Sequence, residues 1–248
     1  MLLIRSLVFQ AYFFVSAVVH ATAVFLCWPF PYSVRFGLAR RWGKTMLSCG
    51  RLVCGLEFVV EGRENIPEEP CVVMIKHSTV FEAYAQLTVF PPQTWVLKRE
   101  LMWIPIFGWG LAALKPIAID RGAGHAAVTQ VIEQGRKKLA EGIWVNIFPE
   151  GTRVLPGVER KYGVSGAALA KEARALVIPV AHNAGDFWPR RSLIKRPGLI
   201  RFCIGPPIDS AALTPKEINQ AVRNWIESKM AEISSTAGHG RVSGDMPG

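Results

Sequence analysis

The sequence has few cysteines and histidines, and neither kind is clustered. No two of its five cysteines form a C-x-x-C pair, and they are scattered along the chain: Cys27, Cys49, Cys54, Cys71 and Cys203. An odd, dispersed set argues against a disulfide framework or a thiolate zinc site and is typical of reduced thiols that face the cytosol. The five histidines contain no H-E-x-x-H motif. We therefore expect no metal ion and no other cofactor.

Acidic residues are absent before Glu57, and no Asp, Glu, Lys or Arg occurs between Arg5 and Arg35. The run from Leu7 to Phe30 is almost wholly apolar, and as a helix it is long enough to cross a bilayer core of about 30 Å. It ends at Trp28-Pro29-Phe30-Pro31-Tyr32, where two prolines stop a helix and the aromatic rings suit a membrane interface. This pattern predicts a membrane-associated helix.

The stretch that follows, to about Leu56, is amphipathic and basic, with five cations set among apolar residues: Arg35, Arg40, Arg41, Lys44 and Arg51. Such a helix lies against anionic lipid headgroups, and its positive charge favours the cytoplasmic side. We expect residues 1–55 to form a pair of membrane-anchoring helices at the cytoplasmic face of the cell inner membrane. Two alternatives are a signal peptide cleaved after Ala21-Thr22-Ala23, which is disfavoured because the apolar run continues past it, and a buried core helix.

From Leu56 onward, short β-rich runs alternate with helical patterns. The predicted strands cover residues 57–60, 71–75, 94–97, 116–119, 143–148, 176–181 and 199–204, and the predicted helices cover residues 79–88, 125–140 and 164–173. A capping box at Thr214-Pro215-Lys216-Glu217 opens another helix, which runs to about Ile233. This alternation predicts an α/β fold over residues 56–233, a single layered domain with a largely parallel sheet flanked by helices. Residues 234–248 are predicted to be a disordered tail.

The first candidate for chemistry is Lys76-His77-Ser78-Thr79-Val80-Phe81-Glu82, which follows the apolar run 71–75. Residues five apart cannot share one face of a regular helix, so His77 must precede the helix while Glu82 projects from its second turn. Glu82 could then orient the imidazole and leave its other nitrogen free to accept a hydroxyl proton. A buried histidine satisfied by its neighbours is the alternative.

Two further blocks each bring an arginine to a loop after a β run. They are Lys115-Pro116-Ile117-Ala118-Ile119-Asp120-Arg121 and Phe148-Pro149-Glu150-Gly151-Thr152-Arg153. Two arginines, a hydroxyl and a lysine can hold a phosphate through charge-assisted bonds, whereas for any single arginine a cap on a surface loop is the favoured explanation. A fourth block, Val177-Ile178-Pro179-Val180, indicates only a buried strand.

In this order the four blocks resemble the glycerolipid acyltransferase family, which contains 1-acyl-sn-glycerol-3-phosphate acyltransferase. The resemblance covers about residues 56–210, and its specific element is F-P-E-G-T-R, present here as written. The chain departs from the family pattern N-H-x-x-x-x-D, with Lys76 for Asn and Glu82 for Asp. It also departs from G-x-x-F-I-x-R, of which only Ile119 and Arg121 match.

The resemblance implies an enzyme that moves a fatty acyl group from acyl carrier protein (acyl-ACP) or coenzyme A (acyl-CoA) to a lysophospholipid, without an acyl-enzyme. His77 would deprotonate the acceptor hydroxyl and Glu82 would orient His77. The acceptor's phosphate would be held by Arg121 and Arg153, and its pocket shaped by three residues: Glu150, Gly151 and Thr152. Lys115, which replaces the family's Gly, is a further phosphate-binding candidate from the residues alone. The acceptor could be 1-acyl-sn-glycerol-3-phosphate, giving phosphatidic acid, or another lyso-lipid such as a lyso-ornithine lipid.

Three other interpretations concern the rest of the chain. The apolar segment 101–109 either lines an acyl-chain tunnel, touches the membrane or is ordinary core. Gly122-Ala123-Gly124-His125-Ala126-Ala127 has the G-x-G-x-x-A spacing of a nicotinamide-dependent oxidoreductase, but tight-turn glycines are the preferred explanation. No G-x-S-x-G occurs, which disfavours a serine hydrolase. The net charge of +10 suits any polyanion, but the densest basic stretch borders the membrane segment, so we expect no nucleic-acid partner.

Overall fold

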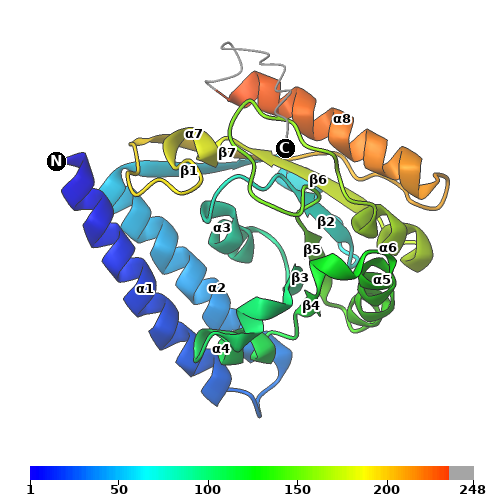
Figure 1. Ribbon diagram of the computed structural model, residues 1–248, viewed down its shortest axis with the longest axis horizontal. Coiled ribbons are helices and arrows are strands. Elements are labelled where there is room, and N and C mark those ends of the chain that lie inside the picture. Colours follow the sequence, from blue (N-terminus) through cyan, green and yellow to red (C-terminus); the bar gives the residue numbers. More distant parts are fainter. Residues whose placement is uncertain (235–248) are drawn as a thin grey trace.

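The computed structural model describes residues 1–234, apart from the side chain of Arg121, so the predicted tail lies outside the described residues except for Ser234. Helices cover both faces of a seven-stranded sheet (Figure 1). The strands are β1 Leu56–Glu61, β2 Val72–Ile75, β3 Gln93–Lys98, β4 Ile117–Ile119, β5 Trp144–Ile147, β6 Val177–His182 and β7 Gly198–Ile204. All seven predicted strands are confirmed, and no boundary differs by more than one residue.

The strand order is β1-β7-β6-β2-β5-β3-β4. Strand β2 pairs in parallel with β5 and β6, and β3 pairs in parallel with β5 and β4. Strand β7 is antiparallel to β6 and carries β1 in parallel beside it, so these two strands run against the other five. The prediction of a largely parallel sheet is confirmed. Every residue of β2, β5 and β6 is buried, as expected for strands covered on both faces.

Three amphipathic helices cover one face of the sheet: α5 His125–Ala140, α6 Ser165–Ala173 and α8 Pro215–Ile233. Their apolar stripes meet strand residues such as Met74 and Ile147 in one hydrophobic core. The predicted capping box begins α8, where the Thr214 hydroxyl accepts the Glu217 N–H and the Glu217 carboxylate accepts the Thr214 N–H. These helices agree with the predicted ones within about a residue.

The opposite face carries α3 Phe81–Val89, which lies between the sheet and the N-terminal helices (Figure 1). Helix α1 Leu2–Leu26 and helix α2 Tyr32–Cys49 run side by side, and a π-helical turn Gly50–Cys54 extends α2 to Gly55, whose φ is 70°. Helix α2 approaches α3 closely at Gly43, where a Cβ would lie 2.7 Å from the Tyr84 carbonyl oxygen. The glycine is therefore required by the packing of the two helices.

Helix α1 is, within residues 1–234, the one helix long and apolar enough to cross a membrane, and only 17% of its most apolar window is buried. The alternative of a buried core helix is therefore wrong. The outward side of α1 exposes large apolar side chains along its length: Leu3, Ile4, Leu7, Val8, Phe14, Val15, Val18, Val19 and Leu26. We call this set the apolar face.

The inward side of α1 is docked on the body of the protein. Phe9 is fully buried, the Ser6 hydroxyl accepts the Lys195 N–H at 2.9 Å, and Ala21 packs on Gly110 so closely that a Cβ at Gly110 would lie 2.8 Å from it. Cleavage after Ala23 would remove Phe9 from the core, which argues against the signal-peptide alternative.

The segment 101–109 forms a short turn Arg99–Trp103 and the start of helix α4 Phe107–Ala113, neither of which was predicted as helical. Trp103 and Trp109 are 69% and 51% exposed, so the core interpretation of this segment is wrong for these two side chains. Trp109 lies 5.7 Å from Phe25, ring centre to ring centre, beside the C-terminal end of α1. The segment therefore brings an exposed tryptophan to the C-terminal end of α1.

Candidate active site

His77 lies in the loop between β2 and α3, where the parallel strand ends, and Glu82 is the second residue of α3. The His77 Nδ1 and the Glu82 Oε1 are 2.7 Å apart. The sequence predicts this contact, but it places Glu82 in the second helical turn. The helix starts at Phe81, later than predicted, so Glu82 lies in its first turn and reaches back to His77 over a longer loop.

The Glu82 carboxylate is surrounded by hydrogen-bond donors. Oε1 accepts the backbone N–H groups of Ser78 and Thr79, both at 3.0 Å, in addition to the His77 ring. The side chain has no solvent exposure. Burial raises the pKa of Glu82, but the hydrogen bonds from His77 and from the backbone outweigh burial, and the pKa stays below its ordinary value. Glu82 is therefore ionised at neutral pH and holds Nδ1 of His77 as the protonated nitrogen.

The other ring nitrogen of His77 is left for chemistry. Nε2 makes no hydrogen bond to any described residue, and the side chain keeps 14% of its surface exposed. The ring stacks on Phe148, the first residue of F-P-E-G-T-R, with centroids 4.1 Å apart and planes 19° from parallel. Stacking and the Glu82 bond together fix the plane of the imidazole.

A second histidine, His182 at the end of β6, lies next to the Glu82 carboxylate. Its Nε2 lies 2.8 Å from the Lys76 carbonyl oxygen and 3.6 Å from Glu82 Oε2, and its Nδ1 accepts the Ala184 N–H. Burial lowers the pKa of His182, so the ring is neutral at physiological pH. Sequence reasoning treated this strand as core only. The signal it passed over is a histidine at the same sheet edge as His77.

The F-P-E-G-T-R loop follows β5 at the same edge of the sheet. It turns at Gly151, whose φ of 67° favours glycine, and returns alongside the catalytic loop, where the Val154 N–H donates to the His77 carbonyl at 2.7 Å. Thr152 and Arg153 are half-buried. The backbone of Arg153 is thus held next to His77, and its carbonyl accepts a bond from Arg190.

Glu150 does not face solvent. Its side chain is fully buried, Oε1 lies 3.3 Å from the Lys76 ammonium, and Oε2 accepts the His77 backbone N–H at 3.3 Å. Burial raises the pKa of Glu150 to about 7 despite the neighbouring Lys76. The structure therefore places Glu150 beneath the site, against the backbone of His77, rather than as an exposed lining of a pocket.

The remaining predicted residues lie in two places. Arg121 begins the turn Arg121–Ala123 directly after β4, at the carboxyl edge that also carries His77 and Glu150. Lys115 precedes β4 at the opposite edge, where its ammonium pairs with Glu141 at 2.9 Å. The structure does not bring Lys115 to the site, because a residue before a parallel strand and one after it lie at opposite ends of that strand.

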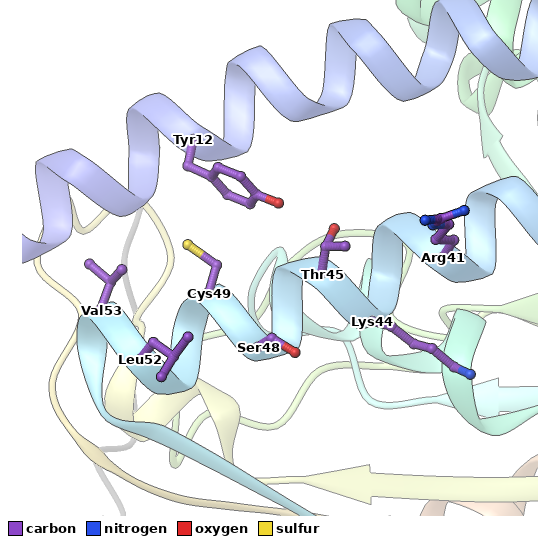
Figure 2. Close-up of a pocket in the computed structure, with 8 residues that line it drawn as sticks. All are labelled: Tyr12, Arg41, Lys44, Thr45, Ser48, Cys49, Leu52 and Val53. Carbon is purple, nitrogen blue, oxygen red and sulfur yellow. The ribbon is translucent and has the colours of Figure 1, made fainter.

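An open groove of about 410 Å³ runs between α1 and α2 (Figure 2). Tyr12 of α1 points into the space between the two helices, Cys49 and Thr45 of α2 face this space from the other side, and Arg41 lies farther along α2. The groove is lined by N-terminal residues alone, and none of the site residues described above borders it. It is therefore separate from the His77 site.

The arrangement around His77 can perform base catalysis on a bound hydroxyl. It has an oriented imidazole with a free nitrogen and a buried carboxylate that stabilises the imidazolium once a proton is taken.

The dinucleotide alternative is not supported. Gly122 and Gly124 follow β4, which is the edge strand of the sheet, whereas dinucleotides bind where the strand order reverses within a sheet.

Known proteins resemble the chain over most of its length. The family model named Acyltransferase matches residues 57–183. The chain is 42% identical over 236 residues to a 1-acyl-sn-glycerol-3-phosphate acyltransferase of Pseudomonas aeruginosa, covering 93% of this chain and 92% of that protein. It is 26% identical to the alpha form of that enzyme in Mus musculus, covering 77% of this chain and 70% of the mouse protein.

A solved structure shares the fold. The crystal structure of the 1-acyl-sn-glycerophosphate (LPA) acyltransferase PlsC from Thermotoga maritima superimposes with a TM-score of 0.79 at 21% identity, covering 94% of this chain and 95% of that one. The matched family segment begins in β1 and ends just after His182, so it contains the whole His77 site. From the family match and the 42% identity we conclude that the chain belongs to the acyltransferase family.

Proposed function

We propose that this acyltransferase moves a fatty acyl group from the thioester of acyl-ACP or acyl-CoA to the free hydroxyl of 1-acyl-sn-glycerol-3-phosphate, forming phosphatidic acid for phospholipid biosynthesis. The observation that carries the proposal is the 2.7 Å bond between His77 and the buried Glu82, which leaves Nε2 of His77 free. The printed names of the Pseudomonas and mouse relatives support the choice of acceptor.

In the proposed reaction, Nε2 of His77 takes the proton of the acceptor hydroxyl as its oxygen attacks the thioester carbonyl. The tetrahedral intermediate then collapses, the carbon–sulfur bond breaks, and the imidazolium returns the proton to the leaving thiolate. Glu82 stays ionised throughout and stabilises the imidazolium. No side chain forms a covalent intermediate, and the products are an ester and a free thiol.

We assign the acceptor's phosphate to Arg153 and Arg121. Arg153 follows Gly151 and Thr152 in the loop that is hydrogen-bonded to the His77 backbone, so a phosphate held there would stand close to the base. Arg121 starts the turn after β4 at the same sheet edge. Guanidinium groups suit this task because they bind phosphate through paired N–H donors.

We place the enzyme at the cytoplasmic face of the cell inner membrane, with α1 embedded in one leaflet. The membrane association itself rests on the apolar face of α1. The embedded orientation follows from docking: Phe9 near one end of α1 and Phe25 near the other both contact the body of the protein. A helix that crossed the bilayer alone would have to leave these contacts. The basic helix α2, which has no acidic residue, supports the cytoplasmic side.

The acceptor is tested by giving the detergent-purified full chain a panel of lyso-lipids, including lysophosphatidic acid and a lyso-ornithine lipid, with acyl-ACP and acyl-CoA as donors. Products are identified by mass spectrometry. We expect phosphatidic acid from lysophosphatidic acid. Acylation of the lyso-ornithine lipid alone would replace the proposed acceptor.

The mechanism is tested by His77→Ala. We expect kcat to fall by about 10²- to 10⁴-fold, the usual contribution of a positioned base, with little change in the KM of either substrate. His125→Ala is the matched control, because His125 is exposed at the start of α5. Near-normal turnover by folded His77→Ala would exclude His77 as the base.

A further inference from the structure

A buried charged cluster lies under the catalytic loop. Lys76 directly precedes His77, and its side chain is only 4% exposed. Its ammonium lies 2.7 Å from Glu227 of α8 and 3.3 Å from Glu150 of the F-P-E-G-T-R loop. The Tyr162 hydroxyl also donates to Glu227, at 2.8 Å. One lysine therefore joins the end of β2, the loop after β5 and the C-terminal helix.

The cluster has one cation for two carboxylates. The groups that face Glu150 are Lys76 after β2, Glu227 on α8 and Tyr162 before α6. Arg223, one turn before Glu227, forms an ion pair with Glu159 instead, with its guanidinium nitrogen 2.8 Å from the Glu159 carboxylate oxygen. Because a buried ion needs a partner, the ionisation of Glu150 depends on the balance between the Lys76 ammonium and the Glu227 carboxylate.

We propose that Lys76 is a positioning residue: its ammonium holds Glu150 as a carboxylate that binds the His77 backbone N–H, and α8 controls this interaction through Glu227. The inference rests on the proposed role of His77. The bond from the His77 N–H to Glu150 at 3.3 Å is the step that joins the cluster to the base. A protonated Glu150 would be a weaker hydrogen-bond acceptor. The loop that contains Glu150 and the loop that contains His77 would then lose the charge-assisted hydrogen bond between them.

The sign of the pH effect follows from the charges. The Glu150 carboxylate is present above its pKa of about 7 and is lost as the pH falls through that value. Removing the Lys76 ammonium raises the pKa of Glu150 further, whereas removing the Glu227 charge lowers it. The acid limb of kcat should therefore move to higher pH in Lys76→Met and to lower pH in Glu227→Gln.

The experiment measures kcat and both KM values against pH for the purified full chain, with lysophosphatidic acid and a thioester donor. We expect Lys76→Met to lose about tenfold or more in kcat at neutral pH, to recover part of this at alkaline pH, and to keep both KM values. Glu150→Gln should remove the effect of the charged cluster on the pH profile of kcat. The double variant Glu150→Gln/Lys76→Met should therefore have the same acid limb of kcat as Glu150→Gln alone. Lys216→Met, exposed at the start of α8, is the control.

Opposite shifts in Lys76→Met and Glu227→Gln support the inference, and a merely structural role would not produce them. Loss of kcat by the same factor at every pH, or unchanged profiles in both variants, would overturn it. If Lys76→Met does not fold, the direction of the Glu227→Gln shift decides. A failure of His77→Ala to reduce turnover would instead reject the proposed function, so the two failures are distinguishable.

Discussion

Replacing Glu82 by Gln tests the His77 pair directly. The substitution keeps the shape of the side chain and removes its charge, while an amide oxygen can still accept the His77 Nδ1–H. What is lost is the attraction between Glu82 and the imidazolium that forms when the acceptor's proton is taken. The N–H donors of Ser78 and Thr79, both 3.0 Å from Oε1, also lose a charged acceptor.

The magnitude follows from the contact between the two residues. Two charges about 4 Å apart at an effective dielectric constant of about 20 attract by about 4 kcal/mol. Since each ~1.4 kcal/mol is tenfold in rate, the upper limit is about a thousandfold loss of kcat. The amide retains part of the hydrogen bond, so we expect a loss of about 10²- to 10³-fold.

The assay is the steady-state rate of ester formation by the purified variant, with a thermal melt of the same sample to show that it is folded. Both KM values should stay close to those of the wild type, because the lost interaction forms only in the transition state. Glu133→Gln on the exposed side of α5 is the matched control. A folded Glu82→Gln enzyme with kcat within about threefold of wild type would show that the charge does not assist His77.

Two further predictions concern the acceptor and the membrane. Arg153→Ala should raise the lyso-lipid KM much more than the thioester KM, because ground-state binding of the phosphate is lost; equal changes in both would contradict the assignment, and Arg136→Ala on α5 is the control. Sodium carbonate washing should leave the full-length protein in the membrane fraction, whereas release into the supernatant, or an N-terminus near Val24 by Edman sequencing, would refute the anchor.

Much of the fold could be predicted because most elements have a strong local signal. The seven strands are short apolar runs bounded by turn residues, and the start of α8 is marked by the capping box of Thr214 and Glu217. The reversed direction of β1 and β7 has no such signal, since strand direction depends on how distant segments pair. Helix α4 was missed because its glycines, Gly108 and Gly110, disfavour helix locally and are retained for close packing.

The contacts of the site could be predicted between residues that are close in the sequence, but not between residues that are far apart in the sequence and meet only in the fold. His77 and Glu82 share one loop and helix start, so their contact could be inferred from spacing. Lys115 was assigned to the phosphate because it is close to Arg121 in the sequence. Strand β4 lies between the two residues and puts them at opposite edges of the sheet. Glu227 reaches Lys76 across 151 positions, and nothing in the sequence around it marks this contact.

The docking of α1 has a consequence for how the chain folds during synthesis. Ser6 binds Lys195 across 189 positions, and β1 pairs with β7 through Leu56 and Gly198, so segments synthesised early find their partners in segments synthesised much later. Contacts of such separation form late and slowly. Until then Phe9 and the rest of the docked side of α1 have no protein cover, in addition to the apolar face. A nascent α1 that rests in the lipid surface would be protected from aggregation, and the rest of the domain would condense onto it.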